Sequence, residues 1–116
     1  MFTDTSPAEV ASLRTLMGLS QDRLADLLGR NRRVVRAWES GEYRIGPESV
    51  ERLKALRDEH DKLVARMINP ESTVVIPRRP HDPYPRGWYL AAAGRAMAAA
   101  PYLIVEWDDA LDDSED

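Results

Sequence analysis

The chain has 116 residues and a formal net charge of −4 at pH 7. This length suits one compact unit, or a small domain with an appendage. The chain contains no cysteine, which excludes a disulfide framework and a thiolate metal site. It has no apolar run near the ~20 residues that a membrane helix needs. Its first residues lack the basic and apolar regions of a signal peptide. We therefore expect a cytoplasmic protein without membrane contact.

The negative charge is concentrated in the second half of the chain. Residues 1–69 carry 12 Lys and Arg against 11 Asp and Glu, whereas residues 70–116 carry 4 against 9. Four arginines, at positions 30, 32, 33 and 36, fall within seven residues. Because salt screens charges over roughly 8–10 Å, this local basic patch is enough to attract phosphates. The acidic total argues only against promiscuous nucleic-acid binding.

Two helices are predicted before this basic patch. Ser6 and Glu9 form a capping-box pattern for a helix that runs to about residue 17. Ser20 is a good N-cap for a second helix, in which three leucines recur at the spacing of one buried face. Gly29 is suited to end that helix in a left-handed conformation.

The basic patch itself predicts a third helix. Asn31 is placed to cap it, Val34 or Val35 and Trp38 point inward, and the arginines point outward. A short amphipathic helix with a cationic outer face, braced by a second helix across a tight turn, is suited to enter the major groove of DNA. The sequence therefore predicts DNA binding.

The rest of the chain predicts a long helix and a small mixed segment. Pro47 opens a helix of about 21 residues, whose second half we expect to pack elsewhere. Strands are predicted at 73–76 and 102–107, with a helix at 87–100 between them. Two such strands are too little for a free-standing sheet, so they pair with each other or across two chains. Residues 108–116 hold six acids and predict a disordered tail.

Short motifs stand at fixed spacing through the first half: Leu13-Arg14, Gly18-Leu19-Ser20-Gln21, Leu24-Ala25, Leu28-Gly29, Val35 and Trp38-Glu39-Ser40-Gly41. Together they resemble the helix-turn-helix family of phage repressors, Cro proteins and related bacterial regulators, over roughly residues 8 to 60. One position departs from the family pattern, because Arg30 stands where an apolar residue usually follows the turn glycine. We interpret Arg30 as a local change in turn packing that adds a phosphate contact.

The resemblance implies a role for each matching residue. It assigns base contacts to Arg32, Arg33, Arg36 and Ala37, the last through a thymine methyl group. It assigns phosphate contacts to Gln21, Arg30, Asn31, Tyr43 and Arg44. A salt bridge between Arg14 and Glu39, and the burial of Trp38, are implied as structural features.

No chemistry beyond binding is indicated. His60 and His81 lack metal-ligand spacing, and Ser, His and Asp are too scattered to support a nucleophilic triad. We expect no metal, no cofactor and no enzyme activity.

The second half is interpreted as a dimerisation segment. Its layout loosely resembles that of anti-CRISPR-associated regulators, and its apolar residues are predicted to hold two copies together: Val74, Ile76, Trp88, Leu90, Leu103, Val105 and Trp107. The predicted fold is mainly α. It consists of a five-helix-type helix-turn-helix domain with an extended last helix over 1–69, a small α+β segment over 70–107, and the acidic tail over 108–116.

The favoured function is a transcriptional regulator, a dimeric repressor that binds a palindromic operator in double-stranded DNA. One alternative is the antitoxin of a toxin–antitoxin pair, with the C-terminal half bound to the toxin. The other is a protein-interaction module with no specific DNA target. An exposed apolar surface on residues 70–107 would favour the antitoxin, and DNA binding insensitive to loss of Arg32 and Arg33 would favour the interaction module.

Overall fold

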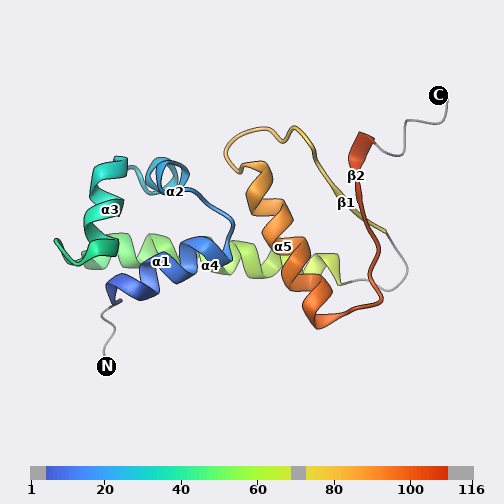
Figure 1. Ribbon diagram of the computed structural model, residues 1–116, viewed down its shortest axis with the longest axis horizontal. Helices are drawn as coiled ribbons and strands as arrows, with labels where there is room; N and C mark the ends of the chain where they lie inside the picture. The colour runs from blue at the N-terminus through green and yellow to red at the C-terminus, as the bar shows by residue number, and fades with distance from the viewer. Residues whose placement is uncertain (1–4, 69–72, 110–116) are drawn as a thin grey trace. The chain divides into compact units, whose positions relative to one another are not determined.

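The computed structural model describes residues 5–68 and 73–109. These residues form five helices and two strands (Figure 1): α1 (Pro7–Leu16), α2 (Gln21–Leu28), α3 (Arg32–Ser40), α4 (Pro47–Met67), β1 (Val74–Ile76), α5 (Arg86–Ala99) and β2 (Val105–Trp107). The mainly helical fold with a small C-terminal sheet is confirmed. None of the described helices is long and apolar enough to cross a membrane. The chain forms two compact units, Met1–Glu59 and His60–Asp116.

Local capping signals set the helix ends in the first unit. The Ser6 backbone N–H donates to the Glu9 carboxylate at 2.8 Å, and the Glu9 N–H donates to the Ser6 hydroxyl at 3.1 Å, so the predicted capping box is present. The Ser20 hydroxyl accepts from the Arg23 N–H at 3.0 Å at the start of α2. Each cap satisfies a backbone donor that the helix itself leaves unpaired.

The core of the first unit lies where the three short helices meet. Val10 of α1, Leu24 and Leu28 of α2 and Val35 of α3 are each no more than 1% exposed. Helix α3 packs against both α1 and α2, and Trp38 is buried on its inner side as predicted. This packing fixes α3 from behind and leaves its arginine side on the surface.

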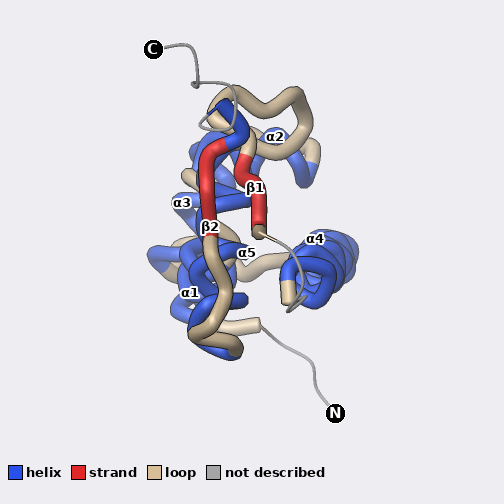
Figure 2. Tube along the Cα trace, turned by 90° about the vertical axis from the view of Figure 1, so that its right-hand side faces the viewer, coloured by secondary structure: helices blue, strands red, loops and turns tan. Residues whose placement is uncertain are grey.

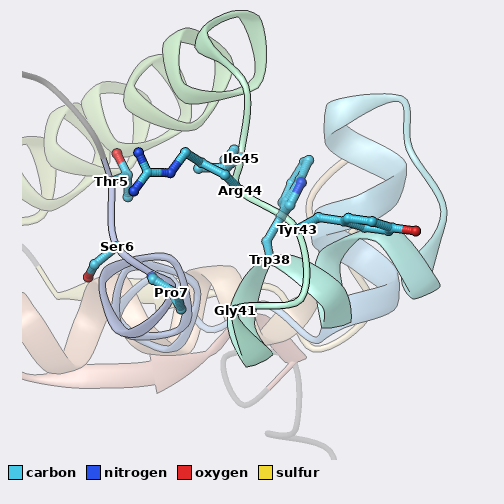
Figure 3. Close-up of a pocket in the computed structure, with 8 residues that line it drawn as sticks. All are labelled: Thr5, Ser6, Pro7, Trp38, Gly41, Tyr43, Arg44 and Ile45. Carbon is cyan, nitrogen blue, oxygen red and sulfur yellow. The ribbon is translucent and has the colours of Figure 1, made fainter.

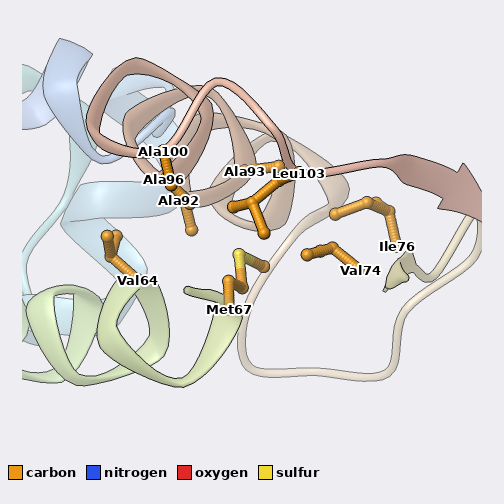
Figure 4. Close-up of a cluster of buried hydrophobic side chains, with 9 residues drawn as sticks. All are labelled: Val64, Met67, Val74, Ile76, Ala92, Ala93, Ala96, Ala100 and Leu103. Atoms are coloured by element: carbon orange, nitrogen blue, oxygen red, sulfur yellow. The ribbon is translucent and has the colours of Figure 1, made fainter. Parts of the chain in front are cut away.

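The second unit is built around small side chains of α5. Ala92, Ala93 and Ala96 are almost fully buried and form one cluster with Val64 and Met67 of α4 and with the strands (Figure 4). The second half of α4 therefore packs with the C-terminal elements, as expected. Alanine at these positions permits close approach of helix to helix, because it carries only a methyl group.

The two strands pair with each other, in parallel. Val74 is opposite Val105 and Ile76 is opposite Trp107, and the Val74 N–H donates to the Ile104 carbonyl at 2.8 Å. Figure 2 shows β1 and β2 side by side. Parallel strands need a long crossover connection, and α5 supplies it. The strands thus pair within one chain. The strand predicted at 102–107 begins only at Val105, and Tyr102 lies in a turn.

This pairing corrects the predicted dimer contacts. Val74, Ile76, Trp88 and Leu103 are between 1% and 8% exposed within a single chain. They offer a second copy almost no surface, because the strands and α5 bury them against each other and against α4. Val105 and Trp107 are half-buried. Of the predicted dimer residues, Leu90 keeps the largest exposed fraction, 43%.

A buried histidine links α4 to α5. His60 is fully buried, with Nε2 2.9 Å from the Trp88 carbonyl and Nδ1 2.8 Å from the Arg95 guanidinium. Because the carbonyl can only accept and the guanidinium can only donate, this arrangement assigns the ring proton to Nε2. Arg95 also pairs with Asp61 at 2.6 Å. His60 is therefore a structural residue of the second unit.

The predicted acidic tail starts with ordered residues. The Arg78 N–H donates to the Asp108 carboxylate at 3.3 Å, and Arg78 Nε donates to Asp109 at 2.7 Å. The Arg78 hydrogen bond lowers the pKa of Asp109 below its usual range. Disorder is thus a wrong prediction for Asp108 and Asp109, while residues 110–116 lie outside the described residues.

Candidate DNA interface

The turn between α2 and α3 is set by a glycine and a distant arginine. Gly29 ends α2 with φ of 69°, in the left-handed region, which glycine enters without a steric penalty. The Arg52 guanidinium of α4 donates to the Leu28 carbonyl at 2.9 Å and so satisfies one of the last carbonyls of α2. Asn31 caps α3 through its side-chain oxygen, which accepts from the Val34 N–H at 3.1 Å. These contacts hold the two helices in a fixed relation.

The outer side of α3 presents three exposed arginines. Arg32 lies 3.9 Å from Asp22 of α2, with both side chains more than half exposed. Such an exposed pair contributes little to stability and leaves Arg32 available to a ligand. Arg33 and Arg36 are also exposed. Within residues 5–68 and 73–109, neither has an ion-pair partner.

Ala37 does not belong to this surface. It is only 4% exposed and is buried together with Val35 and Trp38. A side chain on the inner side of α3 cannot reach a thymine methyl group, so the assigned base contact is corrected. The candidate reading surface therefore consists of Arg32, Arg33 and Arg36.

The N-terminus of α2 is tied to the end of α3. Arg14 donates to both carboxylate oxygens of Glu39, at 2.6 and 3.0 Å, so the salt bridge implied by the resemblance is present, and it is bidentate. Gln21 Nε2 donates to the same carboxylate at 3.0 Å. One N–H of the Gln21 amide is therefore committed inside the protein. A phosphate contact by Gln21 would use the second amide N–H, beside the backbone N–H groups at the N-terminus of α2.

The protonation state of Glu39 follows from these bonds. Burial acts to raise the pKa of Glu39, but the hydrogen bonds from Arg14 and Gln21 and the positive charge of Arg14 outweigh it, so the pKa lies below its usual range. Glu39 is therefore an anion at neutral pH. The structural role predicted for Arg14 and Glu39 matches this geometry.

The loop after α3 borders a small pocket of about 230 Å³. In Figure 3, Arg44 extends across it toward Thr5, whereas Tyr43 points away from it beside Trp38. Tyr43 is 62% exposed, and Arg44 and Arg30 are exposed too. These three of the five predicted phosphate-contacting side chains thus lie at the surface of the first unit.

Sequence reasoning missed two residues that shape this interface. Arg52 lies 24 positions after the carbonyl that it binds, and no local pattern signals a contact over that separation. Asp22 precedes the first arginine of the patch by eight positions and lies 3.9 Å from Arg32. Its position in the first turn of α2 was readable as a helix-dipole preference, but its proximity to Arg32 depends on how α2 and α3 pack.

Comparison with known families agrees with this geometry. Residues 10–61 match a family model described as helix-turn-helix, and this range spans all of α2 and α3 with the Gly29 turn. Residues 10–61 form a helix-turn-helix domain of the Cro type. The match supports a DNA-binding regulator. A comparison with curated proteins finds no match to the chain.

Proposed function

We propose that the chain is a dimeric, sequence-specific repressor that binds a palindromic operator and works in the cytoplasm. The DNA-binding domain lies within residues 1–69 and the dimerisation segment within residues 70–107. The observation that carries the proposal is the exposed arginine side of α3, which the buried side of the same helix holds in place. Arginine pairs with guanine O6 and N7 in bidentate fashion, so Arg32, Arg33 and Arg36 read bases.

The contacts around α3 position it on the duplex. Arg30, Tyr43 and Arg44 are exposed and contact phosphates on either side of the groove. Asn31 and Gln21 add contacts near the helix N-termini, where backbone N–H groups favour an anion. Phosphate contacts fix orientation and base contacts fix sequence. Because one such domain makes few contacts, two copies reading half-sites about 34 Å apart supply the required affinity.

The test is a binding selection with wild-type protein on a randomised duplex library at physiological salt. We expect a two-fold symmetric motif with half-sites about one helical turn, roughly 34 Å, apart. Selection of a single asymmetric half-site would contradict binding of a dimer to a palindromic operator. No enrichment above background would remove sequence-specific DNA binding itself.

A second candidate function is that of an antitoxin, with the same DNA-binding domain. It is favoured by Tyr102 and Ile104, which are each 59% exposed in the second unit. The test is co-expression with the product of the neighbouring reading frame. Growth arrest by that product alone, relieved by the wild-type chain but not by the Tyr102→Glu/Ile104→Glu variant, would favour the antitoxin over a free repressor.

A further inference from the structure

Helix α5 is apolar on almost all sides. Its 14 residues include two arginines, Arg86 and Arg95, and no acid, although residues 70–116 as a whole contain nine acids. One side of α5, including Ala92 and Ala96, faces the core of the second unit. A helix without a polar side is normally buried on all sides. We therefore expect the opposite side of α5 to be buried against a binding partner.

That opposite side carries three residues at helical spacing. Leu90 and Met97 are 43% and 41% exposed, and Gly94 is exposed between them. Residues separated by three or four positions lie on one face of a helix. A Cβ atom added to Gly94 would meet nothing within 4 Å, so the space above this glycine is open. We call Leu90, Gly94 and Met97 the outer face of α5.

We propose that the outer face of α5 packs, antiparallel, on the same face of a second copy of the chain. The inference rests on the proposed dimeric function and names its interface. A two-fold interface must be complementary to itself. Here Leu90 of one copy lies against Met97 of the other, and the two Gly94 residues lie near the crossing point, where the lack of a side chain permits close approach.

Charge also favours a second copy as the occupant. Leu90, Gly94 and Met97 are uncharged, and Arg86, four positions before Leu90 on the same side of α5, lies at the end of the helix. A two-fold axis near Gly94 therefore keeps the two copies of Arg86 apart and brings no like charges together. Residues 70–116 hold nine acids and four basic residues, so surfaces that contain these acids repel each other between two copies. Helix α5 contains no acid, so contact through α5 avoids this repulsion. In the antiparallel arrangement, Arg86 in the first turn lies beside the last turn of the other α5, where the helix dipole is negative.

The first test measures the mass of Leu90→Glu and Met97→Glu variants of the full chain by sedimentation velocity. We expect each to weaken dimerisation by about 30-fold or more, as the loss of a central interface residue does. The matched controls are Val75→Glu and Ile104→Glu, which place the same charge on side chains of the same unit that are 43% and 59% exposed. Both controls should remain dimeric. Circular dichroism checks that all four variants fold.

The second test addresses the antiparallel register. In the Leu90→Glu/Met97→Lys double variant, each introduced acid lies against the introduced base of the other copy, so dimerisation should recover relative to Leu90→Glu alone. Gly94→Leu should weaken dimerisation while leaving the helix content unchanged, because the added side chain has room within its own chain.

The outcomes separate this inference from the proposed function. A dimeric wild type whose mass is insensitive to Leu90→Glu and Met97→Glu overturns the interface and leaves the dimeric repressor standing. A double variant that stays as monomeric as the single one overturns the antiparallel register. A wild type that is monomeric at all concentrations, yet selects a symmetric operator, overturns the interface while preserving sequence-specific DNA binding.

Discussion

Arginine has two distinct tasks in this chain, and its surroundings decide which. Arg14 is largely buried, and its guanidinium donates hydrogen bonds to the Glu39 carboxylate and, at 2.9 Å, to the Leu19 carbonyl. Arg33 is exposed on α3 and has no ion-pair partner in the described residues. A committed guanidinium supports the fold, whereas a free one at a surface is available to a ligand. Substitution at the two positions should therefore change different properties.

Replacing Arg33 with alanine should relax base preference at one or two positions of each half-site. The loss corresponds to about 1–3 kcal/mol of discrimination against the wrong base, with little change in stability because the side chain is exposed. A repeat of the library selection with the variant measures this loss. The control is Lys54→Ala, which removes an exposed cation from α4 of the same unit and should leave base preference unchanged. Equal relaxation by both variants would contradict base contact by Arg33.

Glu39→Gln should lower the free energy of unfolding by about 2–3 kcal/mol at pH 7, because it leaves the Arg14 guanidinium partly buried without its anion. The pKa of Glu39 is lowered in the folded state, so the ionised carboxylate stabilises the fold above its unfolded pKa of about 4.3. That contribution is lost as the pH falls through the folded pKa.

The difference between wild type and Glu39→Gln should therefore shrink below about pH 4. Urea unfolding at a series of pH values measures it, with Glu42→Gln as a control on an exposed carboxylate of the same unit. A difference that stays constant down to pH 3 would show that the charge of Glu39 is not what stabilises the pair.

At the scale of elements, the turn between α2 and α3 depends on one backbone conformation. Gly29→Ala should cost about 1–2 kcal/mol of stability, because an L-residue is strained at its φ of 69°. The added Cβ would also lie 3.2 Å from the Arg52 guanidinium. Thermal unfolding measures the cost. Gly46→Ala is the control, since a Cβ there meets nothing within 4 Å, and equal losses in both variants would contradict this reading of the turn.

The elements themselves could be predicted because their signals are local. Capping residues such as Ser6 and Asn31, and the glycine after α2, act within a few positions and appear in the structure as expected. The burial of Ala37 was also readable, because it lies three positions after Val34 and beside Trp38 on the inner side of α3. That signal was outweighed by the role that the resemblance implied for the position.

Contacts between distant segments could not be predicted in the same way. The Arg52 contact with Leu28 and the His60 contact with Trp88 join residues 24 and 28 positions apart. The apolar residues of β1 and β2 correctly predict that these strands are buried. Periodicity, however, does not show whether the residues that bury them come from the same chain or from a second copy. For Val74 and Ile76 the cover is the chain's own α5 and α4.

At the scale of the whole molecule, a net charge of −4 coexists with a basic reading surface. DNA binding should nevertheless be strongly salt-dependent, because phosphates respond to the local charge on α3 within a Debye length. Of the proposed phosphate contacts, Arg30 and Arg44 carry positive charge. With these two in each of two copies, the slope of log K against log salt should be about −3.5. Fluorescence anisotropy on the selected operator measures the slope. Glu106→Gln, an exposed position in the second unit, should leave it unchanged, and a marked change would show that the total charge governs binding.

The parallel pairing of β1 and β2 also has a consequence for the order of folding. A hairpin can form as soon as its turn is made, but β1 must wait until α5 and the segment after it have been synthesised, because its partner follows them in the chain. Closing so long a loop carries an entropic cost before any strand contact forms. During synthesis, domains emerge and fold from the N-terminus, so the helix-turn-helix domain can be complete while Val74 and Ile76 are still uncovered. A nascent chain that stalls before Val105 would thus hold a finished DNA-binding domain beside an unpaired apolar strand, and an unpaired apolar strand favours aggregation.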